Sequence, residues 1–250
     1  MNRTEIRPLT KTAAHPLWQR ATLSLALAAL GLNLLAGAAV RADDSKPAGG
    51  EELVPLAPKL PPPMFVGTPK DAPEGSNVEA PSDKPRPPLM IPKGVGNVAP
   101  GKKLTSSDTN ATPSNLAKII DGNKEPSDTT TVLLRKGTQY LQFDLGSAHE
   151  IFAIVIWHAH ETPKIYRDVI VQVADDADFT KNLRTLFNND ADDSSKRGVG
   201  TDREYFETNE GKTIDAKGAK AQYVRLYSKG STDSALNEYT EVEIYGRAPK

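Results

Sequence analysis

Two polar groups in the second half of the sequence carry side chains that could bind a ligand. His158 and His160 stand two residues apart at the end of an apolar run, and residues 188–195 read Asn-Asn-Asp-Ala-Asp-Asp-Ser-Ser. Residues two apart on a strand share a face, so the histidines could ligate zinc together, or could mark a strand end that reaches solvent. The acidic run is similar to a calcium loop but lacks the downstream glutamate of an EF-hand, which favours a solvated loop.

The loops that follow Ala159, Phe187 and Tyr227 emerge at one end of the molecule if the strands alternate in direction. Carbohydrate sites combine planar polar groups, which pair with hydroxyls, and an aromatic face, which covers sugar C–H groups. We therefore predict a carbohydrate-binding rim at this end, with Tyr166 and Tyr205 as stacking residues. The rim would gather His158, His160, Tyr166, Asp168, Asn188, Asn189, Asp190, Arg203, Glu204, Tyr205 and Asn237.

Catalysis is not expected. The sequence has no cysteine, no HExxH motif, no serine in a nucleophile elbow and no pair of carboxylates placed by a motif. A net charge of −1 gives no basic face for nucleic acid. We expect a glycan or a cell-surface component as the partner. A protein-interaction or envelope-assembly module is the alternative, and a metal-dependent hydrolase that uses the histidines and aspartates is a remote one.

The elements that must position these residues are short strands. Runs rich in β-branched and aromatic residues alternate with turn signals, which is the all-β pattern; they cover residues 139–145, 150–159, 168–174, 184–187, 205–208, 223–227 and 241–245. The run 150–159 is apolar on both faces, which predicts a central strand covered on both sides, with Trp157 in the core. Thr112-Pro113-Ser114 predicts a helix start and a turn or two through Ile119. This inventory fits a two-sheet jelly roll.

The first 96 residues have a different character. Basic residues precede an uncharged stretch from Ala21 to Val40 that ends in small residues, so we predict a signal peptide over residues 1–42, cleaved after Ala42, and an exported protein, periplasmic, cell-surface or secreted. An uncleaved N-terminal membrane anchor is the alternative. Fourteen of the 20 prolines lie between Asp43 and Pro100, which predicts a disordered, extended linker over residues 43–96.

Four segments in order resemble the discoidin, or coagulation factor 5/8 type C, family. They are Leu116 to Asn123 (LAKIIDGN), Tyr140 to Gly146 (YLQFDLG), Tyr223 to Tyr227 (YVRLY) and Glu241 to Gly246 (EVEIYG), and the resemblance covers residues 97–247. It implies a galactose-binding-like jelly-roll domain that serves adhesion or carbohydrate binding. Some relatives bind phospholipid, but the loop from Glu161 to Ile165 offers only one apolar side chain, so we do not expect this domain to insert in a membrane. The tryptophan usual after the aspartate-glycine turn is absent, and so is the disulfide of animal members.

The turn Asp121-Gly122-Asn123 offers oxygen atoms to a hard cation such as calcium, or forms a simple β-turn in which the aspartate bonds its own backbone. In carbohydrate-binding relatives a structural calcium occupies the corresponding turn. The resemblance therefore implies a calcium site formed by Asp121, Asn123, Asp128 or Thr129, and Glu241.

Overall fold

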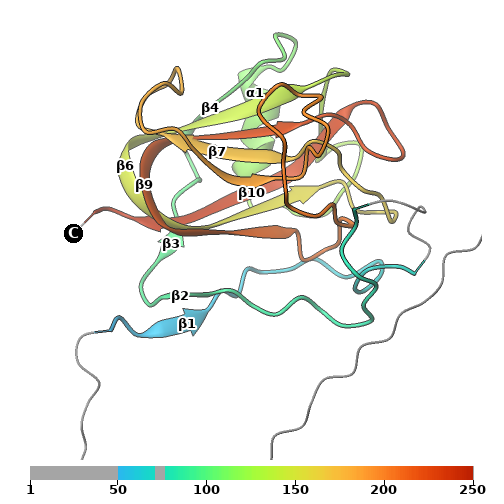
Figure 1. Ribbon diagram of the computed structural model, residues 1–250, viewed down its shortest axis with the longest axis horizontal. Helices are drawn as coiled ribbons and strands as arrows, with labels where there is room; N and C mark the ends of the chain where they lie inside the picture. Colours follow the sequence, from blue (N-terminus) through green and yellow to red (C-terminus); the bar gives the residue numbers. More distant parts are fainter. Residues whose placement is uncertain (1–49, 71–76, 250) are drawn as a thin grey trace, which may run out of the picture. The chain divides into compact units, whose positions relative to one another are not determined.

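The protein, seen here as a computed structural model, is described over residues 50–70 and 77–249. Its regular secondary structure is almost all β-strand, and long loops connect the strands (Figure 1). The strands are β1 (Leu53–Pro55), β2 (Met90–Pro92), β3 (Gly96–Asn97), β4 (Lys103–Ser106), β5 (Val132–Leu134), β6 (Gln139–His158), β7 (Ile170–Ala174), β8 (Arg184–Asn188), β9 (Lys212–Ser228) and β10 (Asn237–Arg247), with a short helix α1 (Pro113–Leu116) and a 3-10 helix η1 (Ala117–Ile120). The predicted all-β sandwich is confirmed.

Two long strands, β6 and β9, pair with each other and take part in both layers of the sandwich. In one layer, the C-terminal half of β6 lies between β10 and the N-terminal half of β9. In the other, the N-terminal half of β6 pairs with β4 and with the C-terminal half of β9, which continues to β7 and β8. The register shifts between Asp144 and His149, where both strands bend (Figure 1). The runs 139–145 and 150–159 are thus halves of one strand.

The main core lies between the two layers. On the first half of β6 it takes Leu141, Phe143 and Leu145, as the alternation predicts, and on the second half Ile154 and Ile156. The run 205–208, by contrast, forms no strand; Phe206 makes a single bridge to Ile165.

The predicted helix is present. Thr112 is its N-cap, and its hydroxyl oxygen accepts a hydrogen bond from the backbone N–H of Asn115 at 3.3 Å. Leu116 and Ile119 point into the main core, with 4% and 0% of their surface exposed. The helical turns therefore close one side of the sandwich just before the Asp121 turn.

The second face of β6 is covered by the proline-rich segment, which we call the strap (residues 50–70 and 77–96). Trp157, Val155 and Ala153 face away from the main core and pack with Leu56 and Ile91 of the strap. The indole N–H of Trp157 donates to the carbonyl of Asn209 at 2.9 Å. Trp157 is in the core as predicted, in a second hydrophobic cluster beneath the strap.

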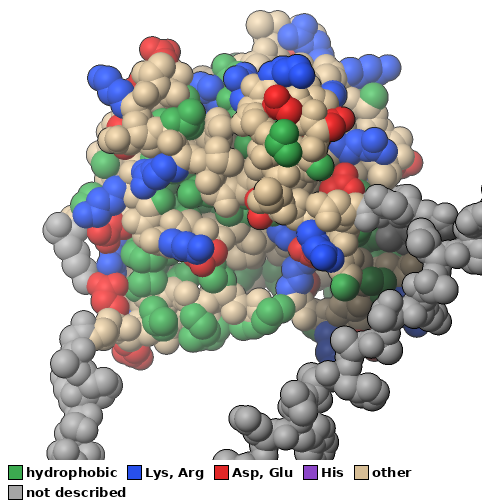
Figure 2. Space-filling model, in the orientation of Figure 1, with side chains coloured by type: hydrophobic (Ala, Val, Ile, Leu, Met, Phe, Trp, Pro, Cys, Tyr) green, Lys and Arg blue, Asp and Glu red, His purple; other side chains and the backbone are tan. Residues whose placement is uncertain are grey.

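The prediction of disorder is therefore wrong for the described part of the linker. β1 and β2 pair antiparallel through Val54 and Ile91, and the backbone N–H of Leu56 donates to the carbonyl of Leu89 at 2.8 Å. Proline prevents a regular sheet from spreading along the strap, but its apolar residues still bury against β6. Other apolar side chains of the strap remain exposed on its outer surface, and Figure 2 shows hydrophobic side chains gathered over β1 and β2. The large exposed hydrophobic residues of the strap are Leu53, Leu60, Met64, Val66 and Met90.

The predicted signal peptide lies outside the described residues, so it stays a prediction. Within residues 50–70 and 77–249, no helix has the length and apolar character needed to cross a membrane.

Candidate functional site

Three loops meet at one end of the sandwich, as the alternating strands predict. They are the β6–β7 loop (residues 159–169), the β8–β9 loop (189–211) and the β9–β10 loop (229–236). The backbone N–H of Arg167 donates to the carbonyl of Gly230, and that of Lys229 donates to the carbonyl of Arg167, at 3.0 and 2.9 Å. The N–H of Asn189 donates to the carbonyl of Val169 at 3.2 Å. These bonds hold the three loops together as one surface.

The loops enclose an open cleft of about 740 Å³. Three residues predicted for the rim, Asp168, Asn189 and Glu204, line it. The full lining is Asn77, Arg167, Asp168, Asn189, Ala191, Asp192, Ser194, Glu204, Lys229, Ser231, Thr232, Asp233, Ser234 and Ala235. None of these described residues is aromatic, and the cleft presents carboxylates, amides, hydroxyls and two cationic side chains.

Asp168 connects two of the loops. Its carboxylate accepts hydrogen bonds from the hydroxyls of Ser194 and Ser195 at 2.5 and 2.7 Å, and the ammonium group of Lys229 lies 3.7 Å away. Its backbone is left-handed, with φ at 50°, which a residue other than glycine adopts only when the surrounding contacts impose it. The Asp168 carboxylate is therefore held rigidly at the edge of the cleft.

The acidic run 188–195 is only in part the solvated loop that the sequence favours: Ala191 and Asp192 are exposed, but residues 188–190 and Ser195 are buried. Asp190 is fully buried, and its carboxylate accepts the backbone N–H groups of Ser194 and Ser195 at 3.0 and 2.9 Å. One carboxylate oxygen each of Asp168, Asp190 and Asp192 lies within 4.8 Å of the others. Because serine N–H and O–H groups already occupy these oxygens, the cluster carries no separate metal assignment.

Burial is the main cause of the raised pKa of Asp190, with further contributions from Asp192 and Asp168. The hydrogen bond from Asp190 lowers the pKa of Asp192 in turn. Asp190 therefore keeps its proton to higher pH than an isolated aspartate does, and Asp192 loses its proton at lower pH. Burial also raises the pKa of Glu204, which lines the same cleft.

Asn189 leaves one donor unused. Its side-chain oxygen accepts the backbone N–H of Val169 at 2.7 Å, which fixes the orientation of the amide. The side-chain nitrogen then has no hydrogen-bond partner among the described residues, although only 4% of the residue is exposed. A buried donor without a partner is costly, and it lies on a residue that lines the cleft.

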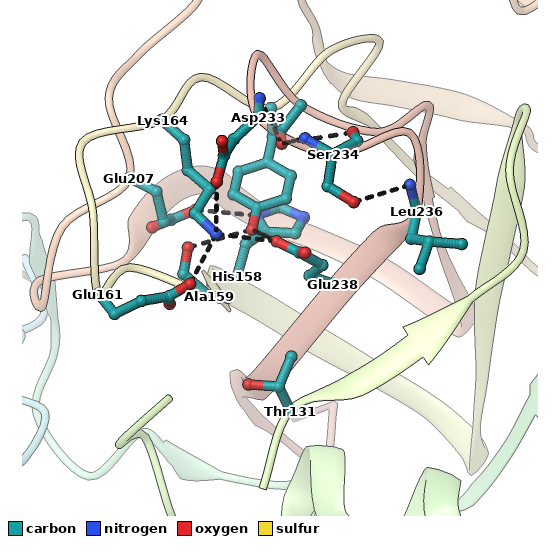
Figure 3. Close-up of polar contacts among 12 residues, drawn as sticks. Thr131, His158, Ala159, Glu161, Lys164, Glu207, Asp233, Ser234, Leu236 and Glu238 are labelled. Atoms are coloured by element: carbon teal, nitrogen blue, oxygen red, sulfur yellow. Dashed lines mark hydrogen bonds and ion pairs between the residues drawn. The ribbon is translucent and has the colours of Figure 1, made fainter. Parts of the chain in front are cut away.

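The two histidines lie beneath the loops and are not on the rim. His158 and Glu207 are both fully buried, and His158 Nδ1 lies 2.8 Å from Glu207 Oε2 (Figure 3). The His160 ring lies 2.9 Å from the carbonyl of Lys124 and is 1% exposed. The rings thus have separate partners, and neither belongs to a metal-binding cluster of three within the described chain.

Tyr166 and Tyr205 are also buried, with 0% exposed, so neither offers a ring face to a sugar in this structure. Tyr166 stacks on His158 at a centroid distance of 4.1 Å, and its hydroxyl donates to Glu238 at 2.6 Å. Burial raises the pKa of both phenols. The prediction that these tyrosines form a stacking platform on the rim is wrong, because both fill the space under the loops.

Lys164 completes this buried layer (Figure 3). Its side chain is 2% exposed, and its ammonium group lies 2.8 Å from Glu161 and 3.1 Å from Glu238. The two carboxylates raise the pKa of Lys164 in spite of its burial. The network ties the β6–β7 loop to the start of β10.

The remaining predicted residues, Asn237, Asn188 and Arg203, do not line the cleft. Asn237 is buried and its amide oxygen accepts from Ser228 and from the backbone of Gly230, which shapes the β9–β10 loop. Asn188 is 7% exposed and donates to the carbonyl of Gly198 at 2.8 Å. Arg203 is exposed and does not line the cleft.

Arg167, Lys229 and Asn77 line the cleft and were not predicted. Arg167 and Lys229 adjoin Asp168 and Ser228, so their nearness to the predicted loop ends was a usable signal. Asn77 belongs to the strap and had no such signal, because its contact with the loops spans more than 100 residues of sequence.

The predicted calcium residues are partly brought together. Glu241 is 1% exposed, its carboxylate accepts a hydrogen bond from the backbone N–H of Gly122 at 3.1 Å, and burial raises its pKa to about 8. This buried carboxylate fits a cation at the turn. Asp121 and Asn123 accept N–H groups two residues further on, as in the simple turn, and Asp128 and Thr129 are exposed. Calcium at this turn stays a prediction.

Residues 118–226 match the family model described as "NedA-like, galactose-binding domain", of F5/8 type C. The match confirms the resemblance drawn from the sequence motifs. A search of curated proteins gives no match.

Several solved structures are similar to this chain. The "CBM32 of AlyQ in complex with 4,5-unsaturated mannuronic acid" is 23% identical, with a TM-score of 0.42 over 57% of this chain and 92% of that one. Truncated AlyQ "with CBM32 and alginate lyase domains" is 21% identical, with a TM-score of 0.42; 59% of this chain and 32% of that one are covered. Chitosan-binding module 1 of a Paenibacillus sp. IK-5 chitosanase/glucanase is 20% identical, with a TM-score of 0.42 over 60% and 99%.

Proposed function

Because residues 118–226 match the F5/8 type C-like, galactose-binding family model, we propose that the chain binds a carbohydrate in the cleft between its three loops. The cleft volume of about 740 Å³ lies within the range of small-molecule sites. Its position at a sandwich end, on loops held by a rigid scaffold, is typical of binding sites.

The observation that carries the proposal is that hydrogen-bond donors and acceptors lie next to each other in the cleft. A sugar hydroxyl donates one hydrogen bond and accepts others, so a site for sugars needs both kinds of group side by side. The Asp168 carboxylate and the Lys229 ammonium group lie 3.7 Å apart at the cleft edge. The unpaired amide of Asn189 adds a donor near them.

The described lining has no aromatic side chain, so the cleft offers no ring on which a sugar could stack. Without a stacking platform, less apolar surface is buried on binding. We therefore expect weak affinity, with a dissociation constant of about 0.1–1 mM, which corresponds to about −4 to −5.5 kcal/mol.

The test is calorimetric titration of the full chain with galactose, other neutral hexoses, amino sugars and uronic acids, each as monomer and short oligomer. Asp168→Asn and Lys229→Met should weaken binding of the best sugar at least fivefold, because each removes a charged hydrogen-bonding group. The matched controls are Asp178→Asn and Lys181→Met, at exposed positions outside the cleft. Failure of every sugar to bind saturably, or equal loss in cleft and control variants, would overturn the proposal.

A further inference from the structure

The strap reaches the cleft at Glu204. Val78 forms a parallel bridge with Glu204, in which the Glu204 N–H donates to the carbonyl of Asn77 at 3.0 Å and the Glu79 N–H donates to the carbonyl of Glu204 at 2.8 Å. Two backbone hydrogen bonds therefore join the strap to the β8–β9 loop. The side chain of Glu204 lines the cleft from this bridge.

An apolar contact extends this attachment to a second loop. Val78 is 8% exposed and packs with Ile165 of the β6–β7 loop and with Phe206, and Phe65 of the strap covers the cluster. Ile165 and Phe206 are themselves bridged. The strap thus contacts two of the three loops that form the cleft.

Arg86 fastens the strap a few residues further on. Its guanidinium group lies 3.3 Å from Glu79 and 3.8 Å from Glu210, and it donates to the carbonyl of Phe206 at 3.0 Å and to the Thr208 hydroxyl at 3.2 Å. Three of these four partners belong to the β8–β9 loop, so the strap and the loop are fixed together by charge as well as by backbone bonds.

Asn77 is placed on the cleft wall by these contacts. It lines the cleft, is exposed, and its side-chain amide reaches the carbonyl of Asp202 at only 3.4 Å, which leaves a second N–H and the amide oxygen for a ligand. We propose that the strap is part of the binding site: Asn77 contacts the carbohydrate, and the strap holds Glu204 in position. The inference rests on the proposed function, and the strap lies outside the segment 118–226 that matches the family model.

Gly67 offers a way to disturb the strap from a distance. Thr68 and Ser82, which lie on either side of Asn77 in the sequence, exchange backbone hydrogen bonds at 2.9 and 3.0 Å and so join two parts of the strap. Gly67 has φ at 75°, and a Cβ atom there would lie 2.0 Å from the carbonyl oxygen of Ser82. Gly94 also has positive φ, at 87°, but a Cβ atom there meets nothing within 4 Å. The two glycines therefore form a matched pair.

The experiment titrates the full chain and three variants with the sugar that wild type binds best, after thermal melts have shown which variants fold. Asn77→Ala removes one ligand contact and should weaken binding about three- to tenfold. Gly67→Ala should weaken binding by at least as much, since it displaces Asn77 and loosens Glu204 together. Gly94→Ala should bind as wild type does.

The outcomes separate the two proposals. If wild type binds no sugar, the proposed function falls and this inference falls with it. If wild type binds and both Asn77→Ala and Gly67→Ala keep full affinity, the cleft is the site but the strap plays no part in it. Should Gly67→Ala fail to fold, Asn77→Ala decides alone, because its exposed side chain can be removed without loss of core packing.

Discussion

Replacing Ile91 by alanine should show that the strap and the sandwich unfold as one unit. Ile91 is 4% exposed and packs with Ala153, Val155 and Trp157 on the outer face of β6. Its neighbour Met90 lies on the same short strand, faces outward and is 49% exposed. The pair provides one buried and one exposed side chain in the same backbone context.

The expected loss follows from cavity formation. Truncation of a buried isoleucine to alanine costs about 2–5 kcal/mol, and we expect about 3 kcal/mol because the strap can close partly over the space. Met90→Ala should change the free energy of unfolding by less than about 0.5 kcal/mol. With a urea m-value of about 2–3 kcal/mol/M for a domain of this size, Ile91→Ala should lower the midpoint by about 1–1.5 M.

Urea titration followed by tryptophan fluorescence measures this shift. In a Trp18→Phe background the signal comes from Trp157 alone, which is buried beneath the strap. A single transition, shifted only in Ile91→Ala, supports the structure. The reasoning is refuted if Ile91→Ala leaves the midpoint unchanged, or if its Trp157 emission is already that of an exposed indole without urea, because the strap would then be a separate, weakly docked unit.

Two further predictions concern buried charges. Lys164→Met should lower the free energy of unfolding in urea by about 3–5 kcal/mol, because it leaves the Glu238 carboxylate without its buried ammonium partner. Glu161→Gln changes a half-exposed carboxylate and should lower it by less than about 1 kcal/mol. Equal losses in the two variants would contradict the buried network. Glu241 has a folded pKa raised by burial from 4.5 to about 8, so the native state binds the proton more tightly and wild-type stability should fall as pH rises from about 4.5 to 8. In thermal melts across this pH range, the stability of Glu241→Gln should change less with pH than that of wild type. If the predicted metal site exists, calcium at pH 8 should stabilise wild type but not the variant. An equal pH dependence of stability in the two proteins would refute the burial cost assigned to Glu241.

The strands and the end of the molecule that carries the cleft could be predicted because the signals are local. The alternation of Leu141, Phe143 and Leu145 depends only on the two-residue period of a strand, and the Thr112 cap depends on three neighbouring residues. The convergence of three loops follows from antiparallel topology without knowledge of any side-chain contact. These features need no information about residues distant in sequence.

The roles of the polar residues could not be predicted in the same way. A histidine at a strand end reaches solvent unless a distant group satisfies it, and for His158 that group is Glu207, which is 49 residues away. Tyr166 likewise depends on Glu238, 72 residues further on. Such partners decide whether a polar residue lies on the rim or beneath it, and their pairing is set by the tertiary fold.

The docking of the strap on β6 could have been predicted from its apolar residues, but its high proline content favoured the prediction of a disordered linker. A strand apolar on both faces needs a cover on each side, and the second layer of a sandwich supplies only one. Between residues 53 and 91 the proline-rich segment carries Leu53, Val54, Leu56, Leu60, Phe65, Val78, Leu89 and Ile91, more apolar side chains than a solvated spacer needs. Taken together, the uncovered face of β6 and this apolar segment predict the docking that the structure has.

Proline itself favours such docking. Because its ring restricts φ in the unfolded chain, a proline-rich segment loses less conformational entropy when it is fixed on a surface. A modest apolar contact, such as that of Leu56 and Ile91 with Trp157, can then hold it in place with few backbone hydrogen bonds. Because this entropy loss is small, few contacts also suffice where the strap continues past β6 to Glu204. There, two backbone hydrogen bonds and the contacts of Arg86 hold the strap against the cleft. The prolines that prevent a regular sheet thus help to order the segment that connects the outer face of the sandwich with its binding end.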